Sequence, residues 1–159
     1  MTAVRLVAPD DWALVREIRL RALGDSPSAF ASTLELEVAF DEAEWRRRIA
    51  GGPWWLAFDG DRPVGLVAAY PPDGDERHLV AMWVEPAARG TSTAADLVEA
   101  VCGWAADAGA GTVALWVADG NDRARRFYER LGFVATGERQ PLPSNPEIGE
   151  ELMRRSLGE

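Results

Sequence analysis

The sequence has no lysine, a single cysteine, a single histidine and no apolar run long enough to cross a membrane. One cysteine cannot form an internal disulfide, and the first ten residues, MTAVRLVAPD, lack the apolar core of a signal peptide. We therefore expect a cytoplasmic protein with no membrane partner. Cys102 lies beside Val101 and Trp104 in an apolar helical pattern, which favours a small core residue over a nucleophile.

Positive charge is also scarce. The chain carries 17 basic side chains, all of them arginine, against 26 acidic ones, and its formal net charge is −9. Binding a nucleic-acid backbone requires a basic face, so we expect no nucleic-acid partner, and a cationic partner suits the acidic balance better. The 159 residues fit a single domain over residues 1–159 and leave no room for a second.

Local signals place the elements of the first third of the chain. A short apolar strand is expected at residues 4–7, followed by an amphipathic helix that ends near Gly24. A second helix is expected to start at the capping pattern Asp41-x-x-Glu44 and to end at Gly51. The segment DSPSAFASTLELE between these two helices contains turn formers followed by acidic residues.

Strand and helix patterns alternate in the rest of the chain. Apolar runs at residues 54–58 and 64–70 flank the turn sequence DGDRP and predict a hairpin. A strand at 78–84, a helix at 93–108 and a continuously apolar strand at 112–117 then form a β-α-β crossover. The expected fold class is α/β, of the α+β type: a mixed, mostly antiparallel twisted sheet with helices on both faces.

The loop VEPAARGTSTA, residues 84–94, joins the strand to the helix and has the character of an anion site. The first N–H groups of a helix have no partner within it, and the helix dipole places partial positive charge there. Downstream, the apolar strand is followed by N-D-R-A-R-R-F-Y-E-R-L-G-F at residues 121–133. This order of motifs resembles the GCN5-related N-acetyltransferase (GNAT) family over residues 64–133.

The resemblance implies a GNAT fold that uses acetyl-CoA as acetyl donor, without a metal. Loop N–H groups would hold the pyrophosphate of coenzyme A, and the end of the preceding strand would bind its pantetheine arm. Asn121 would face the same arm while capping its helix, and Arg125 would neutralise a cofactor phosphate. The implied cofactor-binding residues are Met82, Trp83, Val84, Arg89, Gly90, Thr91, Ser92, Thr93, Ala94, Asn121 and Arg125.

The loop departs from the family pattern at two positions. The family usually has glycine where this chain has Ser92, and often a basic residue where it has Thr91. Serine keeps its backbone donor and adds a hydroxyl, but its Cβ restricts the approach of a ligand. We therefore expect weaker or tilted cofactor binding.

The resemblance also implies catalytic roles. Tyr128 takes the position of the acid that protonates the leaving thiolate, and a backbone N–H near Val84 that of the oxyanion donor. His78 lies where several family members carry a catalytic glutamate, and its ordinary pKa near 6.5 suits a general base. The alternatives for the base are a water chain or one of three carboxylates, Glu76, Glu35 and Glu37.

We expect direct acetyl transfer to a primary amine of a small molecule, a peptide or a protein. The alternative is a non-catalytic acyl-CoA-binding sensor of the same fold, which Ser92 favours and Tyr128 disfavours. The sequence leaves open the acceptor and the choice between a monomer and a homodimer, and it assigns no role to the C-terminal segment PLPSNPEIGEELMRR.

Overall fold

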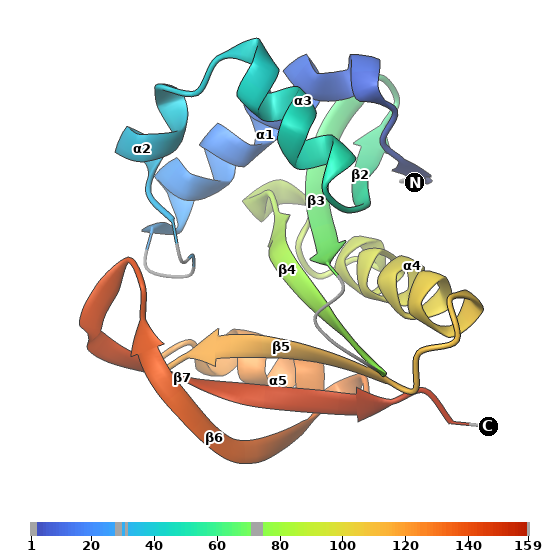
Figure 1. Cartoon of the computed structure of the whole chain (residues 1–159), viewed down its shortest axis with the longest axis vertical. Coiled ribbons are helices and arrows are strands. Elements are labelled where there is room, and N and C mark those ends of the chain that lie inside the picture. Colours follow the sequence, from blue (N-terminus) through green and yellow to red (C-terminus); the bar gives the residue numbers. More distant parts are fainter. Residues whose placement is uncertain (1–2, 28–29, 31, 71–74, 159) are drawn as a thin grey trace.

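The computed structural model describes residues 3–27, 30, 32–70 and 75–158, and places the two termini on the same side of the view in Figure 1. In chain order the elements are β1 (Ala3–Leu6), η1 (Pro9–Asp11), α1 (Trp12–Asp25), α2 (Leu34–Val38), α3 (Glu42–Ala50), β2 (Trp54–Asp59), β3 (Arg62–Tyr70), β4 (Glu76–Val84), η3 (Pro86–Ala88), α4 (Thr93–Asp107), β5 (Thr112–Ala118), α5 (Asp122–Arg130), β6 (Val134–Leu142) and β7 (Asn145–Ser156).

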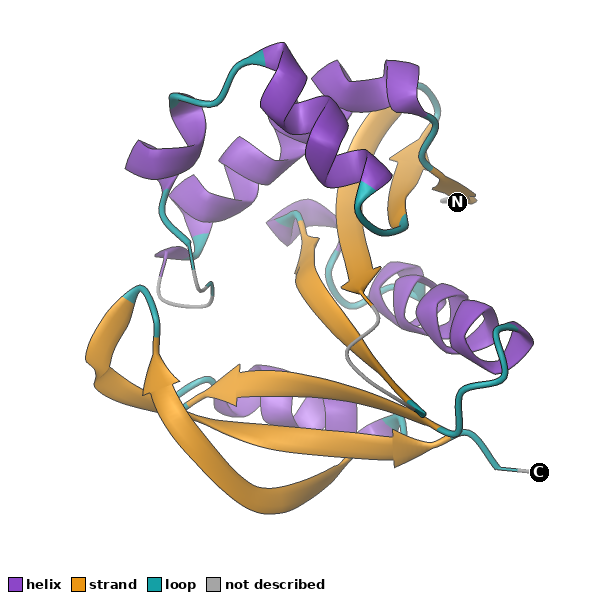
Figure 2. Ribbon diagram, in the orientation of Figure 1, coloured by secondary structure: helices purple, strands orange, loops and turns teal. Residues whose placement is uncertain are grey.

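A seven-stranded sheet with the order β1-β2-β3-β4-β5-β7-β6 organises the molecule. β4 and β5 pair in parallel through the crossover helix α4, and every other neighbouring pair is antiparallel. The helices form two layers, with α1, α2 and α3 over one face and α4 and α5 over the other (Figures 1 and 2). The predicted mixed sheet with helices on both faces is therefore confirmed.

Each face of the sheet carries its own apolar core. On one face α1 and α3 contribute Val15, Ile18 and Trp45 to a cluster that includes Leu56 and Leu66 of the sheet. The other face packs α4 and α5 against the sheet, and Cys102 is buried there, as predicted. Burial raises the pKa of the Cys102 thiol to about 11, so the thiol stays protonated near neutral pH.

β4 is the strand that opens the sheet. Leu66 pairs with Trp83 but Ala68 pairs with Val80, so β4 carries one extra residue at this bulge. Ala81 lies in the bulge with φ at 62°, a left-handed conformation that is rare for a residue with a Cβ. β4 pairs with β5 only from Glu76 to His78, and within the described residues the two strands separate beyond that point. The bulge and the separation create the space for a site.

The C-terminal segment forms the hairpin of β6 and β7, which the sequence left unassigned. β6 is an edge strand, so Pro141 costs no hydrogen bond to a neighbouring strand on its outer side. At the turn of this hairpin the Ser144 hydroxyl donates to the carbonyl of Phe30, which follows α1. The hairpin therefore reaches across the sheet to the α1–α3 layer, as Figure 1 shows at its left side.

Most predicted boundaries agree with the structure to within two residues. The predicted Asp41 cap is confirmed, since its carboxylate accepts the N–H of Glu44 at 2.9 Å. The segment between α1 and α3 contains the short helix α2, while Ser28, Ala29 and Ala31 of that segment lie outside the described residues. None of the described helices is long and apolar enough to cross a membrane.

Candidate active site

Two adjacent cavities lie where β4 and β5 separate. The larger, of about 550 Å³, is within the range typical of ligand sites, and the smaller is about 100 Å³. The larger cavity is bounded by the end of β4, the loop before α4 and one face of α5. Both cavities are lined by Phe30, Met82, Asn121, Ala124 and Tyr128. The structure therefore brings together three segments that are far apart in the sequence.

Backbone donors line the larger cavity at the N-terminus of α4. Gly90, Thr91, Ala94 and Ala95 all contribute to its wall. Their N–H groups have no hydrogen-bond acceptor among the described residues, whereas the next amide, that of Asp96, bonds to the Ser92 carbonyl. Gly90 adopts a φ of 81°, which only glycine reaches without strain. The loop thus presents unpaired donors and the positive end of the helix dipole, as predicted.

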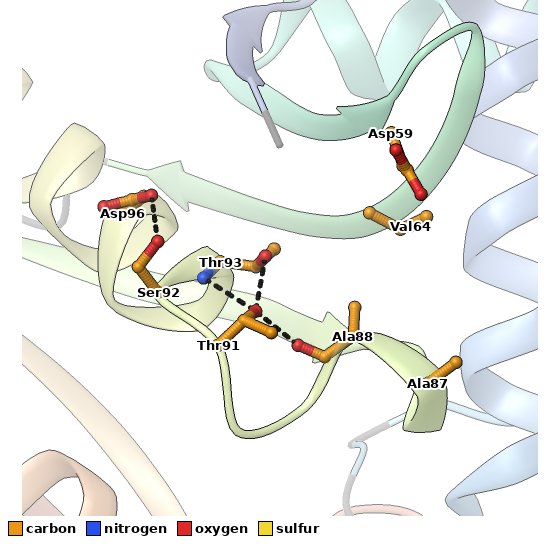
Figure 3. Close-up of a pocket in the computed structure, with 8 residues that line it drawn as sticks. All are labelled: Asp59, Val64, Ala87, Ala88, Thr91, Ser92, Thr93 and Asp96. Carbon is orange, nitrogen blue, oxygen red and sulfur yellow. Dashed lines mark hydrogen bonds between the residues drawn. The ribbon is translucent and has the colours of Figure 1, made fainter. Parts of the chain in front are cut away.

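A third cavity, of about 560 Å³, lies on the other side of the same loop and is shown in Figure 3. The name "larger cavity" is kept for the larger of the two between β4 and β5. Asp59 and Asp96 line the third cavity, and none of the described residues in its wall is basic. Arg89, Arg123 and Arg130 line the cavity between the strands instead. A polyanionic ligand is repelled by carboxylates, so the charge of the two walls favours the cavity between the strands for an anion.

Ser92 and Thr93 face this third cavity (Figure 3). The Ser92 hydroxyl lies 3.1 Å from Oδ2 of Asp96, and the Thr93 hydroxyl lies 2.9 Å from that of Thr91. Their side chains therefore stabilise the start of α4 and do not line the larger cavity. The structure does not bring these two predicted cofactor residues into its wall.

The Arg89 side chain turns back onto the protein. Its Nε donates to the carbonyl of Val84 at 2.9 Å, and its terminal nitrogen donates to Asp25 at 2.9 Å. Trp83 also donates its indole N–H to Asp25 at 3.0 Å. Hydrogen bonds, including those from Ser26 and Trp83, hold the pKa of Asp25 below its ordinary value. Arg89 therefore ties the loop to the end of β4 and the end of α1.

The backbone of Val84 faces the opening between the strands. The amide of Glu85 bonds to the Val64 carbonyl at 2.9 Å, which places the ladder bonds of β4 on alternate residues. The N–H of Val84 consequently points away from β3, toward the side where β5 has separated. This donor is available to a ligand that enters between the strands.

Tyr128 and Asn121 extend from the other wall. Tyr128 is 7% exposed, lines both cavities, and its hydroxyl has no hydrogen-bond partner among the described residues. Burial raises the pKa of the Tyr128 phenol well above its ordinary value, so the phenol is protonated at neutral pH. Asn121 caps α5 by accepting the Ala124 N–H, and it also lines both cavities. Its position is therefore compatible with the cap and with a place facing the cofactor arm, the two roles expected of it.

His78 lies at the closed end of the strand pair, where β4 still pairs with β5. Its Nε2 is 3.1 Å from Glu76, and its Nδ1 is 3.4 Å from the Tyr70 hydroxyl. Glu76 also accepts from Arg154 at 2.6 Å. Burial opposes ionisation of Glu76, but these hydrogen bonds outweigh it and hold its pKa below the ordinary value. His78 lines none of the three cavities, and both ring nitrogens have partners.

Two further predicted residues are engaged elsewhere. Arg125 donates to Glu151 of β7 at 2.7 Å and does not line the larger cavity, where Arg123 and Arg130 are found instead. Glu37, one candidate for the base, is fully buried and accepts hydrogen bonds from Arg19 and Arg48. Burial raises its pKa, but the two guanidinium groups outweigh this and lower it overall. Glu37 therefore has a structural role, as a buried carboxylate paired with two arginines.

Sequence reasoning missed residues that reach the site from other parts of the chain. Asp25, at the end of α1, belongs to a turn-forming segment of the sequence that indicates no role in the site, yet it binds both Trp83 and Arg89. Phe30 lines both cavities, and its apolar character was the only signal. Glu35, the remaining carboxylate candidate, is exposed on α2 and lines none of the three cavities.

Comparison with known proteins assigns the family. A family model described as the acetyltransferase (GNAT) family matches residues 15–133, so the chain belongs to that family. A curated relative, an uncharacterised N-acetyltransferase of Mycobacterium tuberculosis (strain ATCC 25618 / H37Rv), is 43% identical over 68 residues. The aligned region covers 42% of this chain and 44% of that relative, less than half of either.

Solved structures share the whole fold. A GNAT-family acetyltransferase from Streptococcus pneumoniae matches with a TM-score of 0.83 at 19% identity, covering 99% of this chain and 100% of that one. The ribosomal-protein-S18-alanine N-acetyltransferase of Escherichia coli gives 0.73 at 16% identity, with coverages of 100% and 96%. The Salmonella typhimurium yncA protein, solved with its cofactor acetyl-CoA, gives 0.78 at 18%, with coverages of 100% and 95%. These TM-scores establish a common fold.

Proposed function

We propose that this chain transfers the acetyl group of acetyl-CoA directly to a primary amine of a small molecule, a peptide or a protein. The observation that carries the proposal is that the unpaired amides of α4 and the buried Tyr128 line one cavity at the opening between β4 and β5. Family membership and the acetyl-CoA named in a structure of the same fold support the choice of donor.

The cavity fits the three parts of coenzyme A. The unpaired amides that line the larger cavity and the side chains of Arg123 and Arg130 suit the pyrophosphate. Backbone groups at the end of β4 suit the amides of the pantetheine arm, because β5 no longer occupies their hydrogen-bonding side. The small side chains of Ala94 and Ala95 leave room for the phosphates to approach the helix.

Acetyl-CoA supplies an activated acyl group as a thioester. The chain's own residues provide the remaining requirements of the transfer. The Val84 N–H is suited to stabilise the oxyanion that develops on the carbonyl, because it faces the opening and has no ladder partner there. Tyr128 is suited to donate its proton to the sulfur as the carbon–sulfur bond breaks, because its phenol is protonated and buried and has no hydrogen-bond partner among the described residues.

Ligand-dependent unfolding tests the donor assignment. CoA or acetyl-CoA at a hundred times its dissociation constant should stabilise the protein by about 2.7 kcal/mol, whereas pantetheine, which lacks the pyrophosphate, should stabilise it far less. Ala94→Asp places a carboxylate in the first turn of α4, which suits the helix dipole but repels phosphate. We expect this variant to remain folded by circular dichroism and to lose the stabilisation by CoA.

Release of free thiol from acetyl-CoA, measured against a panel of primary amines, tests the transfer itself. Amine-dependent thiol release with matching acetylated product supports a transferase. Tight binding of acetyl-CoA without turnover on any amine would instead favour the acyl-CoA-binding sensor. Absence of stabilisation by millimolar CoA would remove the donor assignment.

A further inference from the structure

Three glutamates are buried among the described residues: Glu37, Glu85 and Glu150. Glu37 binds Arg19 and Arg48, and Glu85 binds Arg21 and Arg62. Among the described residues Glu150 has no cationic partner and accepts a single hydrogen bond, from the Gln140 amide to its Oε1 at 2.6 Å. A carboxylate removed from water without a cation is costly, so its position calls for a functional explanation.

Glu150 lies at the open end of the site. It stands directly opposite Ala118 in the β5–β7 ladder, so both side chains lie on the same face of the sheet. Ala118 lines the smaller cavity together with Tyr128 and Asn121. Neighbouring strands are about 5 Å apart, which places the Glu150 carboxylate within reach of that cavity.

One carboxylate oxygen of Glu150 is free. Oε2 has no hydrogen-bond partner among the described residues, and the side-chain atoms that are both unpaired and sealed from solvent are Nη1 of Arg19 and Nε1 of Trp45. Oε2 is therefore not sealed from solvent, although Glu150 is only 5% exposed. The hairpin that carries Glu150 contacts the carbonyl of Phe30, a residue of both cavity walls, through Ser144.

We propose that Glu150 binds the ammonium group of the acceptor and accepts the proton that must leave before the amine can attack. This inference rests on the proposed transferase function and deepens it, because it assigns the acceptor subsite to the C-terminal hairpin. An alkyl ammonium has a pKa near 10.4 and is protonated at neutral pH, so a carboxylate both attracts it and offers a site for its proton.

Glu150 and Tyr128 together account for every proton that moves in the reaction. An N–H bond of the ammonium breaks, its electron pair remains on nitrogen, and the proton forms an O–H bond on Glu150. The neutral amine then attacks the carbonyl carbon and loses a second proton. Tyr128 gives its proton to the sulfur as the carbon–sulfur bond breaks and regains one from the nitrogen. Glu150 returns its proton to water, so one proton is released per turnover.

The surroundings of Glu150 favour this role. Burial raises its pKa, and the Gln140 amide only partly offsets this, which brings the carboxylate nearer to the pKa of a useful base. Along the same face Arg154 is bound to Glu76, and His78 is bound to Glu76 and Tyr70 at the closed end. Next to Gly149 at the hairpin, Arg139 and Asp119 bind each other.

The neighbouring residue provides a matched control. Glu151 follows Glu150 on β7 but points to the other face, where it accepts from Arg125 and from the Gly137 amide. Replacing either glutamate by glutamine removes one charge with almost no change in shape. Glu150→Gln and Glu151→Gln therefore differ in which face of the strand loses the charge.

The test compares wild type, Glu150→Gln and Glu151→Gln, with butylamine as the acceptor probe and saturating acetyl-CoA. We expect Glu150→Gln to lower kcat/KM at pH 7 by about a hundredfold, with stabilisation by CoA unchanged. We expect Glu151→Gln to stay within about threefold of wild type. Wild-type kcat/KM should fall as the pH drops through the pKa of Glu150. This acid limb of the pH profile should be absent in Glu150→Gln.

A second measurement does not depend on turnover. The ¹³C carboxyl signal of Glu150 in the CoA-bound protein should titrate above the ordinary pKa of 4.5 and should shift when butylamine is added. Glu150→Gln within threefold of wild type, an acid limb shared by both proteins, or a carboxyl signal unaffected by butylamine would each overturn the proposal. CoA binding and wild-type thiol release test the transferase function, so the two proposals fail by different readouts.

Discussion

The two ends of the β4–β5 pair use the same strands in opposite ways. At the closed end, where Glu76 to His78 pair with β5, the ring of His78 and the carboxylate of Glu76 have their hydrogen-bonding capacity engaged. At the open end, beyond the bulge at Ala81, the side of β4 that faces away from β3 has no strand partner among the described residues, and the hydroxyl of Tyr128 has no hydrogen-bond partner among them. Satisfied polar groups stabilise a fold, whereas unsatisfied ones in a cavity are available to a ligand.

The difference shows why the type of a residue does not reveal its role. His78, the residue type expected of a base, is hydrogen-bonded to Glu76 and Tyr70, while Glu150, in a segment with no recognisable motif, has an unbonded oxygen and lies opposite Ala118 of the cavity wall. The position of each group relative to the strand separation is the deciding feature. Substitutions at the two ends should therefore affect different properties of the protein.

The largest effect is expected at the open end, from Tyr128→Phe. This change keeps the ring that packs against Phe133 and removes only the hydroxyl. We expect kcat to fall by about ten- to a thousandfold, with acetyl-CoA affinity by calorimetry nearly unchanged, because only the proton donor to the leaving thiolate is lost. Full turnover under conditions where chemistry limits the rate would refute the role of Tyr128 as the acid.

A smaller effect, on stability, is expected at the closed end from Glu76→Gln. The variant loses charge-assisted hydrogen bonds to Arg154 and His78, which are partly open to solvent, so we expect a loss of about 1 kcal/mol in urea unfolding near pH 7. kcat/KM should change less than threefold. A large loss of turnover without a loss of stability would contradict the division between the two ends.

The pH dependence of Glu76→Gln sharpens this prediction. The folded-state pKa of Glu76 lies below its unfolded value, so its stabilisation is complete above the ordinary pKa of 4.5 and is lost as the pH falls through the folded pKa. The stabilities of wild type and variant should therefore converge in acid. A difference that persists unchanged at the lowest pH where the protein folds would exclude this ionic contribution.

The smallest effect is expected from Ser92→Gly, in the loop before α4, which separates the larger cavity between the strands from the third, acidic cavity. The Ser92 hydroxyl bonds to Asp96 on the side away from the larger cavity, so its removal should leave acetyl-CoA affinity within about twofold or improve it. A tenfold weaker affinity by calorimetry, about 1.4 kcal/mol, would show that the hydroxyl is itself a ligand.

Local patterns in the sequence were sufficient for much of the fold and for the framework of the site. The Asp41 and Asn121 caps, the helix that starts at Thr93 and the glycine at residue 90 each depend on neighbours a few residues away. The free amides of the loop before α4 could be predicted for the same reason. A helix N-terminus leaves these groups unpaired whatever the rest of the chain does.

Partners of long side chains could not be predicted in this way. Arg89 reaches Asp25 across 64 positions of sequence. Arg125 binds Glu151 of a hairpin that the proline-containing C-terminal segment does not indicate by its sequence. Glu37 reads as a surface residue of a short acidic helix, yet it is buried between two arginines. Such pairings depend on which elements pack together, which no local pattern encodes.

By itself the sequence determined the order of the elements up to α5, the unpaired amides at the start of α4 and the presence of a protonated phenol on α5. Tertiary structure alone decided how far β4 and β5 separate, which face of the loop carries the positive charge, and that Glu150 lies opposite Ala118, a residue of the smaller cavity's wall. The physical reason is range: sterics and backbone hydrogen bonds act between near neighbours, whereas burial and charge pairing depend on the whole packed chain.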